Sequence, residues 1–191
     1  MTIVLILLPY AVYALLMLVV SPVLSLAVGA ALCLAVVIVD VARGRSIKLL
    51  SAGSAAVFVA LAWYCGIVES GMSATAIRIA VDGGILVIAL GSMLAGFPFT
   101  LQYAVESVPA ETAAMPGFLR ANQVITGAWA VATALMMAAN IMMIFVPGLP
   151  IWTGLAIAFA ARNSALYFTR WYPQHRIKSE IRPAGAELAA K

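Results

Sequence analysis

Long apolar stretches separated by short polar or proline-containing breaks make up most of the chain. Each stretch is close to the length of about 20 residues that an α-helix needs to cross a bilayer. We therefore predict an all-α fold, a polytopic membrane helix bundle with about six transmembrane helices. The expected spans cover residues 2–20, 23–41, 49–68, 74–96, 118–146 and 151–168.

The first two expected spans are separated only by Ser21 and Pro22, and Pro9 lies inside the first span. Proline is tolerated in the first turn of a helix, so Ser21 and Pro22 fit a tight turn before the second span. An alternative stays open, in which this first pair forms a hairpin that does not fully cross the membrane.

The composition agrees with a lipid environment. The 191 residues are 65% hydrophobic and only 9% charged, whereas a soluble domain has about 25% charged residues. So few charged side chains could not cover a surface that faces water. The expected partner is therefore the lipid bilayer. The net charge of +4 favours membrane orientation and contact with anionic headgroups over a nucleic-acid partner.

Basic residues gather on one side of the predicted bundle. Of the 11 Lys and Arg residues, all except Arg78 fall in breaks or span ends that would face the same side. Basic loops stay in the cytoplasm, and six spans bring the chain back to the side from which it began. We predict that both termini are cytoplasmic, together with a loop at 97–117 and a disordered tail at 173–191.

The loop at 97–117 is the only sizeable one between the expected spans. Leu101, Val105 and Val108 recur in it at near-helical spacing, which predicts a short interfacial helix. Long loops in compact chains are often functional, so this segment is a candidate contact surface.

Few polar residues lie within the expected spans, and each needs a partner or a function because polar groups are costly in lipid. Arg78 and Asp82 are four residues apart, so both lie on one helical face and can pair. Asn140 falls at a comparable depth on a span that runs in the opposite direction. These three residues predict one polar layer. It is either a solute or proton site, or an internal ion pair with a hydrogen bond between helices.

A second polar layer is expected at the opposite end of the bundle. Asp40 closes the second span, Glu106 follows the fourth, Asn122 lies early in the fifth, and Arg162 lies near the end of the sixth. We predict that Arg162 pairs with Asp40 or Glu106. The alternative is that its long side chain extends to the cytoplasmic surface.

Motifs of enzymes and cofactor sites are missing. The chain has no Ser/His/Asp set, no HExxH, no phosphate-binding loop and no Cys/His spacing for a metal. We therefore expect no enzymatic activity, no metal and no cofactor. Cys33 and Cys65 would lie at different depths, which argues against a disulfide. Ala128 and Ala132, four residues apart, would allow close packing within the bundle or against another copy.

Several short segments resemble the small multi-pass inner-membrane family called intracellular septation protein A. The segments that resemble it are Phe118-Leu119-Arg120-Ala121-Asn122, Trp129-Ala130-Val131, Ala139-Asn140-Ile141 and Trp171-Tyr172-Pro173-Gln174. The likeness is best between Leu119 and Asn140. It implies a bacterial inner-membrane protein without enzymatic activity that is linked to the cell envelope and to septation.

Two functions are therefore expected. The first is a cell-envelope and septation-associated factor that acts by associating with other envelope membrane proteins or with its own copies. The second is a small transporter or permeation protein with a polar site around Arg78, Asp82 and Asn140. An enzyme that acts on lipid is a third and weaker alternative, which a pocket with two or more titratable groups would favour. A water-filled cavity at Asp82 would favour transport, and pairing of Arg78 with Asp82 in a packed interior would favour the scaffold.

Overall fold

The computed structural model describes residues 3–68, 71–146 and 148–189, with side chains described for 7–68, 71–146, 148–150 and 152–176. Every regular element in this part of the chain is a helix, which confirms the predicted all-α class. The expected turn residues Glu69, Ser70 and Pro147, the side chains of Lys178 and Arg182, and Lys191 lie outside the described residues.

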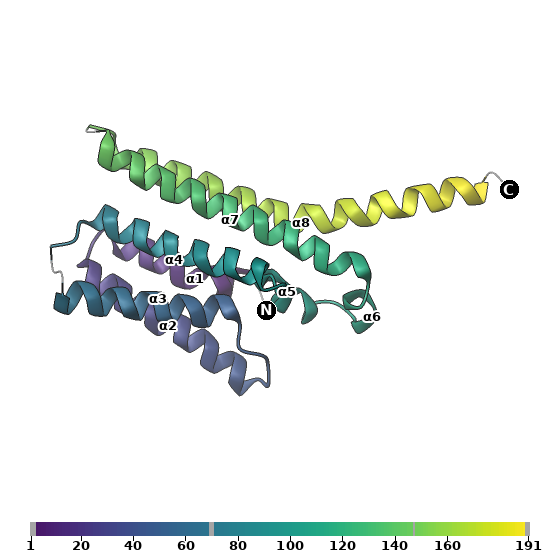
Figure 1. Cartoon of the computed structure of the whole chain (residues 1–191), viewed down its shortest axis with the longest axis horizontal. Coiled ribbons are helices and arrows are strands. Elements are labelled where there is room, and N and C mark those ends of the chain that lie inside the picture. The colour runs from purple at the N-terminus through teal and green to yellow at the C-terminus, as the bar shows by residue number, and fades with distance from the viewer. Residues whose placement is uncertain (1–2, 69–70, 147, 190–191) are drawn as a thin grey trace.

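Long helices lie side by side and run back and forth along the molecule (Figure 1). The chain forms α1 at Ile3–Leu16, α2 at Pro22–Ala42, α3 at Leu49–Trp63, α4 at Ala74–Leu94, α7 at Pro116–Phe145 and α8 at Ile151–Ala189. One π-helical segment, Tyr64–Val68, extends α3. The two shortest helices, α5 at Phe99–Val105 and α6 at Ala110–Ala113, lie in the predicted loop.

Four helical segments in the described part of the chain are long and apolar enough to cross a membrane: Pro22–Ala42, Leu49–Val68, Ala74–Leu94 and Pro116–Phe145. The prediction of about six spans is thus supported for four of them. The first expected span is shorter than predicted, because α1 has 14 residues. The last expected span is interrupted by Arg162 and Asn163, which lower the hydropathy of α8.

Capping residues and a glycine explain where α2 and α4 begin and where α4 ends. Ser21 caps α2 by accepting a hydrogen bond from the Leu24 N–H at 3.3 Å, and Ser73 caps α4 in the same way through Ala76 at 3.2 Å. Gly96, at φ 76°, ends α4 in the left-handed conformation that glycine adopts freely. The chain then turns at once into α5.

Neighbouring helices pack in the order α1, α2, α3, α4, α7 and α8. The core between α1, α2 and α3 is built around Phe58, whose ring lies 5.1 Å from that of Tyr13 and 6.1 Å from that of Tyr10. Between α3 and α4, a Cβ on Gly84 would lie 2.7 Å from a methyl group of Val57. The close approach of these two helices therefore depends on glycine, as small residues permit in membrane bundles.

The C-terminal segment differs from our expectation. In place of a disordered tail from residue 173 onward, α8 continues without a break to Ala189 and extends away from the bundle (Figure 1). Both the apolar start and the polar continuation belong to one 39-residue helix. The hydropathy pattern shows where the apolar part of α8 ends. It does not show where the helix ends, because the polar residues that follow are also helical.

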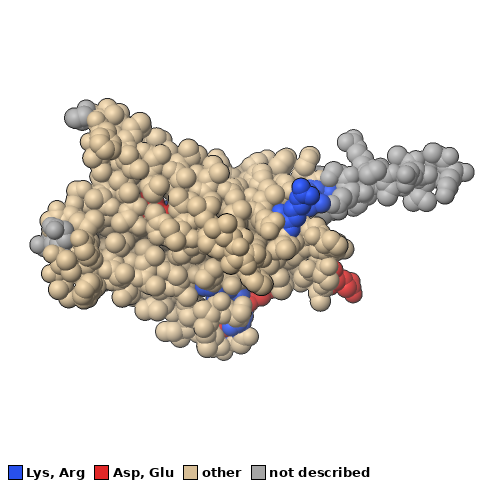
Figure 2. Space-filling model, in the orientation of Figure 1, with Lys and Arg blue, Asp and Glu red and all other residues tan. Residues whose placement is uncertain are grey.

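Charged side chains are rare on the body of the molecule. In the view of Figure 2, the Lys and Arg side chains lie toward the end that holds α5 and α6, which we call the α5 end. A small red area also lies within the otherwise uncharged body, so an acidic group is visible between the apolar helices.

Candidate functional site

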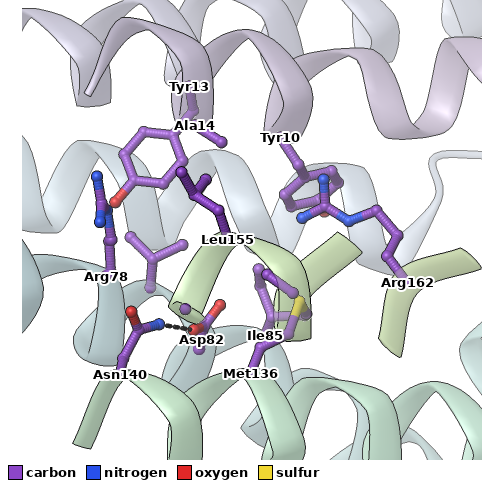
Figure 3. A pocket seen from close by; sticks show the side chains of 13 residues that line it. Tyr10, Tyr13, Ala14, Arg78, Asp82, Ile85, Met136, Asn140, Leu155 and Arg162 are labelled. Atoms are coloured by element: carbon purple, nitrogen blue, oxygen red, sulfur yellow. Dashed lines mark hydrogen bonds between the residues drawn. The ribbon is translucent and has the colours of Figure 1, made fainter. Parts of the chain in front are cut away.

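A half-open cavity of about 80 Å³ lies between α1, α4, α7 and α8. Part of its wall is apolar, and the rest consists of polar or charged side chains that point toward one another (Figure 3). We call it the polar cavity and define it by these side chains: Tyr10, Tyr13, Arg78, Asp82, Asn140 and Arg162.

Asp82 and Asn140 meet in the polar cavity as the sequence predicted. The Asn140 amide donates a hydrogen bond to Asp82 Oδ2 at 2.9 Å and thereby joins α7 to α4. Both side chains are half-buried. Their depths match because α4 and α7 are antiparallel neighbours, so a residue early in one helix lies beside a residue late in the other.

The expected ion pair between Arg78 and Asp82 is not formed. Among the described residues the ion pairs are Arg45–Asp40 and Lys48–Glu106, and neither includes a group of the polar cavity. Asp82 points toward Asn140, whereas Arg78 points toward the hydroxyl of Tyr13 (Figure 3). A spacing of four residues brings two side chains to one helical face, but it does not choose their rotamers.

Arg162 also lines the polar cavity, which corrects its predicted place near Asp40 and Glu106. It interacts electrostatically with Asp82 and Tyr10. Arg162 lies 11 residues after the start of α8 at Ile151, a rise of roughly 16 Å at 1.5 Å per residue. Asp82 lies roughly 12 Å into α4 by the same measure, and both helices start at the end opposite the α5 end.

Two tyrosines of α1 complete the polar cavity, and sequence reasoning missed both. Tyr10 and Tyr13 are three residues apart, which places them on one face of the helix. The Tyr10 hydroxyl bonds Ser54 Oγ at 2.5 Å. The Tyr13 hydroxyl is buried and has no hydrogen-bond partner among the described residues. The signal available in the sequence was this pair of tyrosines in an otherwise apolar helix.

The charges of the polar cavity do not balance. Two guanidinium groups, which stay protonated in proteins, face a single carboxylate. Neither guanidinium lies within 4.0 Å of that carboxylate, because no such ion pair is formed by the described residues. The arrangement thus holds cations and an acid around an open space, where a solute or water can lie between them.

Asp40 and Glu106 lie in a separate group of charged residues where the loop between α2 and α3 meets α5. We call it the loop cluster, consisting of Asp40, Arg45, Ser46, Lys48 and Glu106. The Lys48 ammonium is fully buried and pairs with Glu106, and it also donates to Ser46 Oγ at 2.9 Å. Arg45 lies 3.7 Å from the buried Asp40 carboxylate, whose oxygens accept no hydrogen bond from the described residues.

Electrostatics in the loop cluster favour the ionised acid. The hydrogen bond from Lys48 holds the pKa of Glu106 below its usual range, with further help from the charge of Lys48. On the other side of Lys48 lies the Tyr103 ring, 5.8 Å from the ammonium to the ring centre. Burial raises the pKa of the Tyr103 hydroxyl to about 12. These contacts fix α5 to the loop and leave no charge of the pair unmatched.

Asn122 lies outside both groups. Its amide donates to the Phe118 carbonyl of its own helix at 2.9 Å, and its backbone carbonyl accepts from Thr100 Oγ1 at 3.0 Å. It lines a second cavity of about 260 Å³ beside α5, where Trp129 Nε1 donates to Thr169 Oγ1 at 3.0 Å. Asn122 therefore joins α5 to α7 and does not belong to the polar cavity.

Neither a metal nor a disulfide organises these sites in the described part of the chain. No group of three or more His, Cys, Asp or Glu residues there could hold a metal ion. Cys33 and Cys65 are free and buried. Comparison of the chain with protein-family models, with curated proteins and with solved structures found no match.

Proposed function

We propose that this multi-pass membrane protein binds a small polar solute within its helix bundle, as a small transporter or permeation protein does. The observation that supports this proposal is the polar cavity, where Arg78, Asp82 and Arg162 surround an open space without forming an ion pair. The described part of the chain offers four candidate spans to hold such a site in a membrane.

Energetics favour a binding role over a purely structural one. An Arg or Asp at the centre of a membrane helix costs roughly 2.5–3.5 kcal/mol. Charged groups kept for structure reduce this cost by pairing directly, as Lys48 and Glu106 do. Asp82 instead accepts one hydrogen bond from Asn140 and leaves both arginines facing the cavity. Ionisable groups that stay costly in this way mark solute or ion pathways.

Uptake into proteoliposomes tests the proposal. The full chain is reconstituted and exposed to labelled chloride, nitrate, acetate, phosphate, sodium and methylammonium. We expect uptake of at least one probe, and we expect Asp82→Asn to change its rate severalfold. Glu111→Gln removes the same charge from the exposed helix α6 and serves as the matched control. Equal uptake by wild type and Asp82→Asn, or no uptake of any probe, would refute the proposal.

A second candidate function is association with other envelope membrane proteins in the context of septation. The likeness to intracellular septation protein A between Leu119 and Asn140 supports it. So does a groove of about 510 Å³ between α7 and α8, lined largely by small residues such as Ala128, Ala132, Ala161 and Ala165. Small residues let another helix approach closely in lipid.

Crosslinking in bacterial membranes tests this second function. Ala128→Ile, at a half-buried position of the groove, would narrow it and should reduce the recovery of specific crosslinked partners severalfold. Ala95→Ile, on an exposed residue after α4 and away from the groove, is the control. Partners that are unchanged by Ala128→Ile, or absent altogether, would argue against association through this surface.

We propose that the α5 end faces the cytoplasm of a bacterial inner membrane. The loop with Arg43 and Arg45 lies at this end, and basic loops are retained on the cytoplasmic side. A single cysteine at position 43, in a chain with Cys33→Ser and Cys65→Ser, should be labelled only after the membrane is opened. Labelling of position 43 in intact spheroplasts would indicate the opposite orientation, with the α5 end outside the cytoplasm.

A further inference from the structure

We propose that the solute of the polar cavity is a small monovalent anion, either a halide or a planar oxyanion of the size of nitrate or formate. This inference rests on the proposed solute-binding function and adds the class of solute. It follows from three properties of the polar cavity, namely its charge, its hydrogen-bond donors and its size.

The net charge of the polar cavity indicates that its solute is an anion. The polar cavity contains two arginines and one aspartate, and its other polar groups are an amide and two phenols. With Asp82 ionised, the net charge of these side chains is one positive charge, and protonation of Asp82 would increase it to two. A net charge inside a bundle surrounded by lipid is costly. One monovalent anion brings the sum to zero, whereas a cation would raise it and a divalent anion would reverse it.

Hydrogen-bond chemistry agrees with an anion. Arg78 and Arg162 present N–H donors and no acceptors, and the Tyr13 O–H is buried without a partner. The Tyr10 hydroxyl is engaged by Ser54, and the Asn140 amide by Asp82. The free groups of the polar cavity are thus mainly donors. A ligand that only accepts, such as a halide or a carboxylate, satisfies them, and guanidinium groups bind planar oxyanions through paired hydrogen bonds.

Size favours the smaller members of this class. The half-open cavity has a volume of about 80 Å³, enough for a few water molecules or for a solute of a few non-hydrogen atoms to lie between its walls. Nitrate, formate and halides fall within this limit. Gluconate carries the same single charge with many more atoms, so it distinguishes size from charge.

Thermal unfolding of the detergent-solubilised full chain provides the first measurement. Sodium salts of nitrate, formate, chloride and gluconate are compared at constant ionic strength. An anion that binds the folded state raises Tm as its concentration increases. We expect this increase for the small anions and not for gluconate. Arg162→Gln should raise the concentration needed by roughly tenfold to a hundredfold, as expected for loss of a charged hydrogen bond.

Matched variants separate site binding from general charge effects. Arg170→Gln removes the same charge from an exposed position on the same helix and should leave the nitrate response unchanged. Arg162→Lys keeps the charge but loses the planar pair of donors, so it should bind chloride nearly as well as wild type and nitrate less well. An equal response of Arg162→Gln and Arg170→Gln would overturn the inference.

Raising the positive charge of the polar cavity gives a test that misfolding cannot imitate. Asp82→Asn raises the net charge of the cavity from one to two positive charges. Sulfate stabilises folded proteins in general, but it should raise the Tm of this variant more than that of wild type or of the exposed control Glu111→Gln. If the anions ranked in the same order by their effect on Tm in Asp82→Asn as in wild type, the argument from charge would be contradicted.

The outcomes also separate this inference from the proposed function. Asp82-dependent uptake of sodium or methylammonium, without any response to small anions, would refute the assignment of the solute as an anion. The proposed transport function would still be supported. A response to small anions without uptake would keep the anion site and refute transport. No response to any ion would refute both.

Discussion

The polar cavity and the loop cluster use the same residue types in opposite ways. In the loop cluster each cation has its own acid, with Lys48 against Glu106 and Arg45 against Asp40. In the polar cavity Arg78 and Arg162 share Asp82, and neither forms an ion pair with it. Direct pairing holds segments together, because breaking it leaves a charge buried alone. Charges that surround an open space are instead available to a solute.

The comparison predicts that stability depends on the loop cluster and solute binding on the polar cavity. Substitutions in the two regions should therefore have different consequences even where they remove the same charge.

Lys48→Ala should have the largest effect on stability. Its ammonium is fully buried and donates to Glu106, and its removal loses this charged hydrogen bond and leaves a gap beneath α5. Glu106 is exposed and stays solvated, so the loss comes from the hydrogen bond and the buried stem of Lys48, about 3 kcal/mol in all. Denaturation in mixed micelles measures the loss. Arg43→Ala, at an exposed position of the same loop, should change stability by less than about 0.5 kcal/mol. Equal effects would remove the contrast between paired and exposed charges.

Asn140→Ala should have an intermediate effect. Asp82 loses its hydrogen-bond donor, and a polar group left without a partner costs about 1–3 kcal/mol. Asn163→Ala, which removes an amide from an exposed position on α8, is the control and should cost less than about 0.5 kcal/mol. Should both variants unfold at the same denaturant concentration, the bond between α4 and α7 would have no measurable role in stability.

Acidic pH should weaken the loop cluster. The pKa of Glu106 is lowered in the folded state, so its contribution to stability is fully present above its ordinary pKa of about 4.3. It is lost as the pH falls through the lower folded-state value. Unfolding measured between pH 6 and pH 3 should show this loss in wild type. Glu106→Gln should show a flatter profile over the same range, and parallel profiles would contradict the assignment.

Helix depth is the part of the site that the sequence predicted well. The span boundaries placed Asp82 and Asn140 at matching depths, and the two side chains meet. Depth follows from counting residues at a constant rise along a helix. The position of Arg162 was predicted incorrectly because its depth was counted from an assumed helix end near Phe168. The helix continues to Ala189, so only a count from its start gives the right level.

Side-chain direction and the tyrosines could not be predicted in the same way. The spacing of Arg78 and Asp82 gives a shared face, but their rotamers depend on Asn140 and Tyr13, which come from other helices. Tyr10 and Tyr13 add to the apolar character of α1, so a hydropathy pattern conceals their hydroxyl groups. The pairing of Lys48 with Glu106 was also missed, because it depends on how the segment after α4 folds back onto the loop.

Arg162→Gln should have the smallest effect on stability and the largest on solute response. No ion pair is lost, since Arg162 forms none with the described residues, and removal of a charge from an apolar bundle offsets part of the lost packing. We expect a change in unfolding free energy within about 1 kcal/mol, together with a nitrate-dependent rise in Tm that needs roughly tenfold to a hundredfold more nitrate than in wild type. A fall as large as that of Lys48→Ala would mean that Arg162 stabilises the bundle through Asp82, and that the two regions differ less than their geometry indicates.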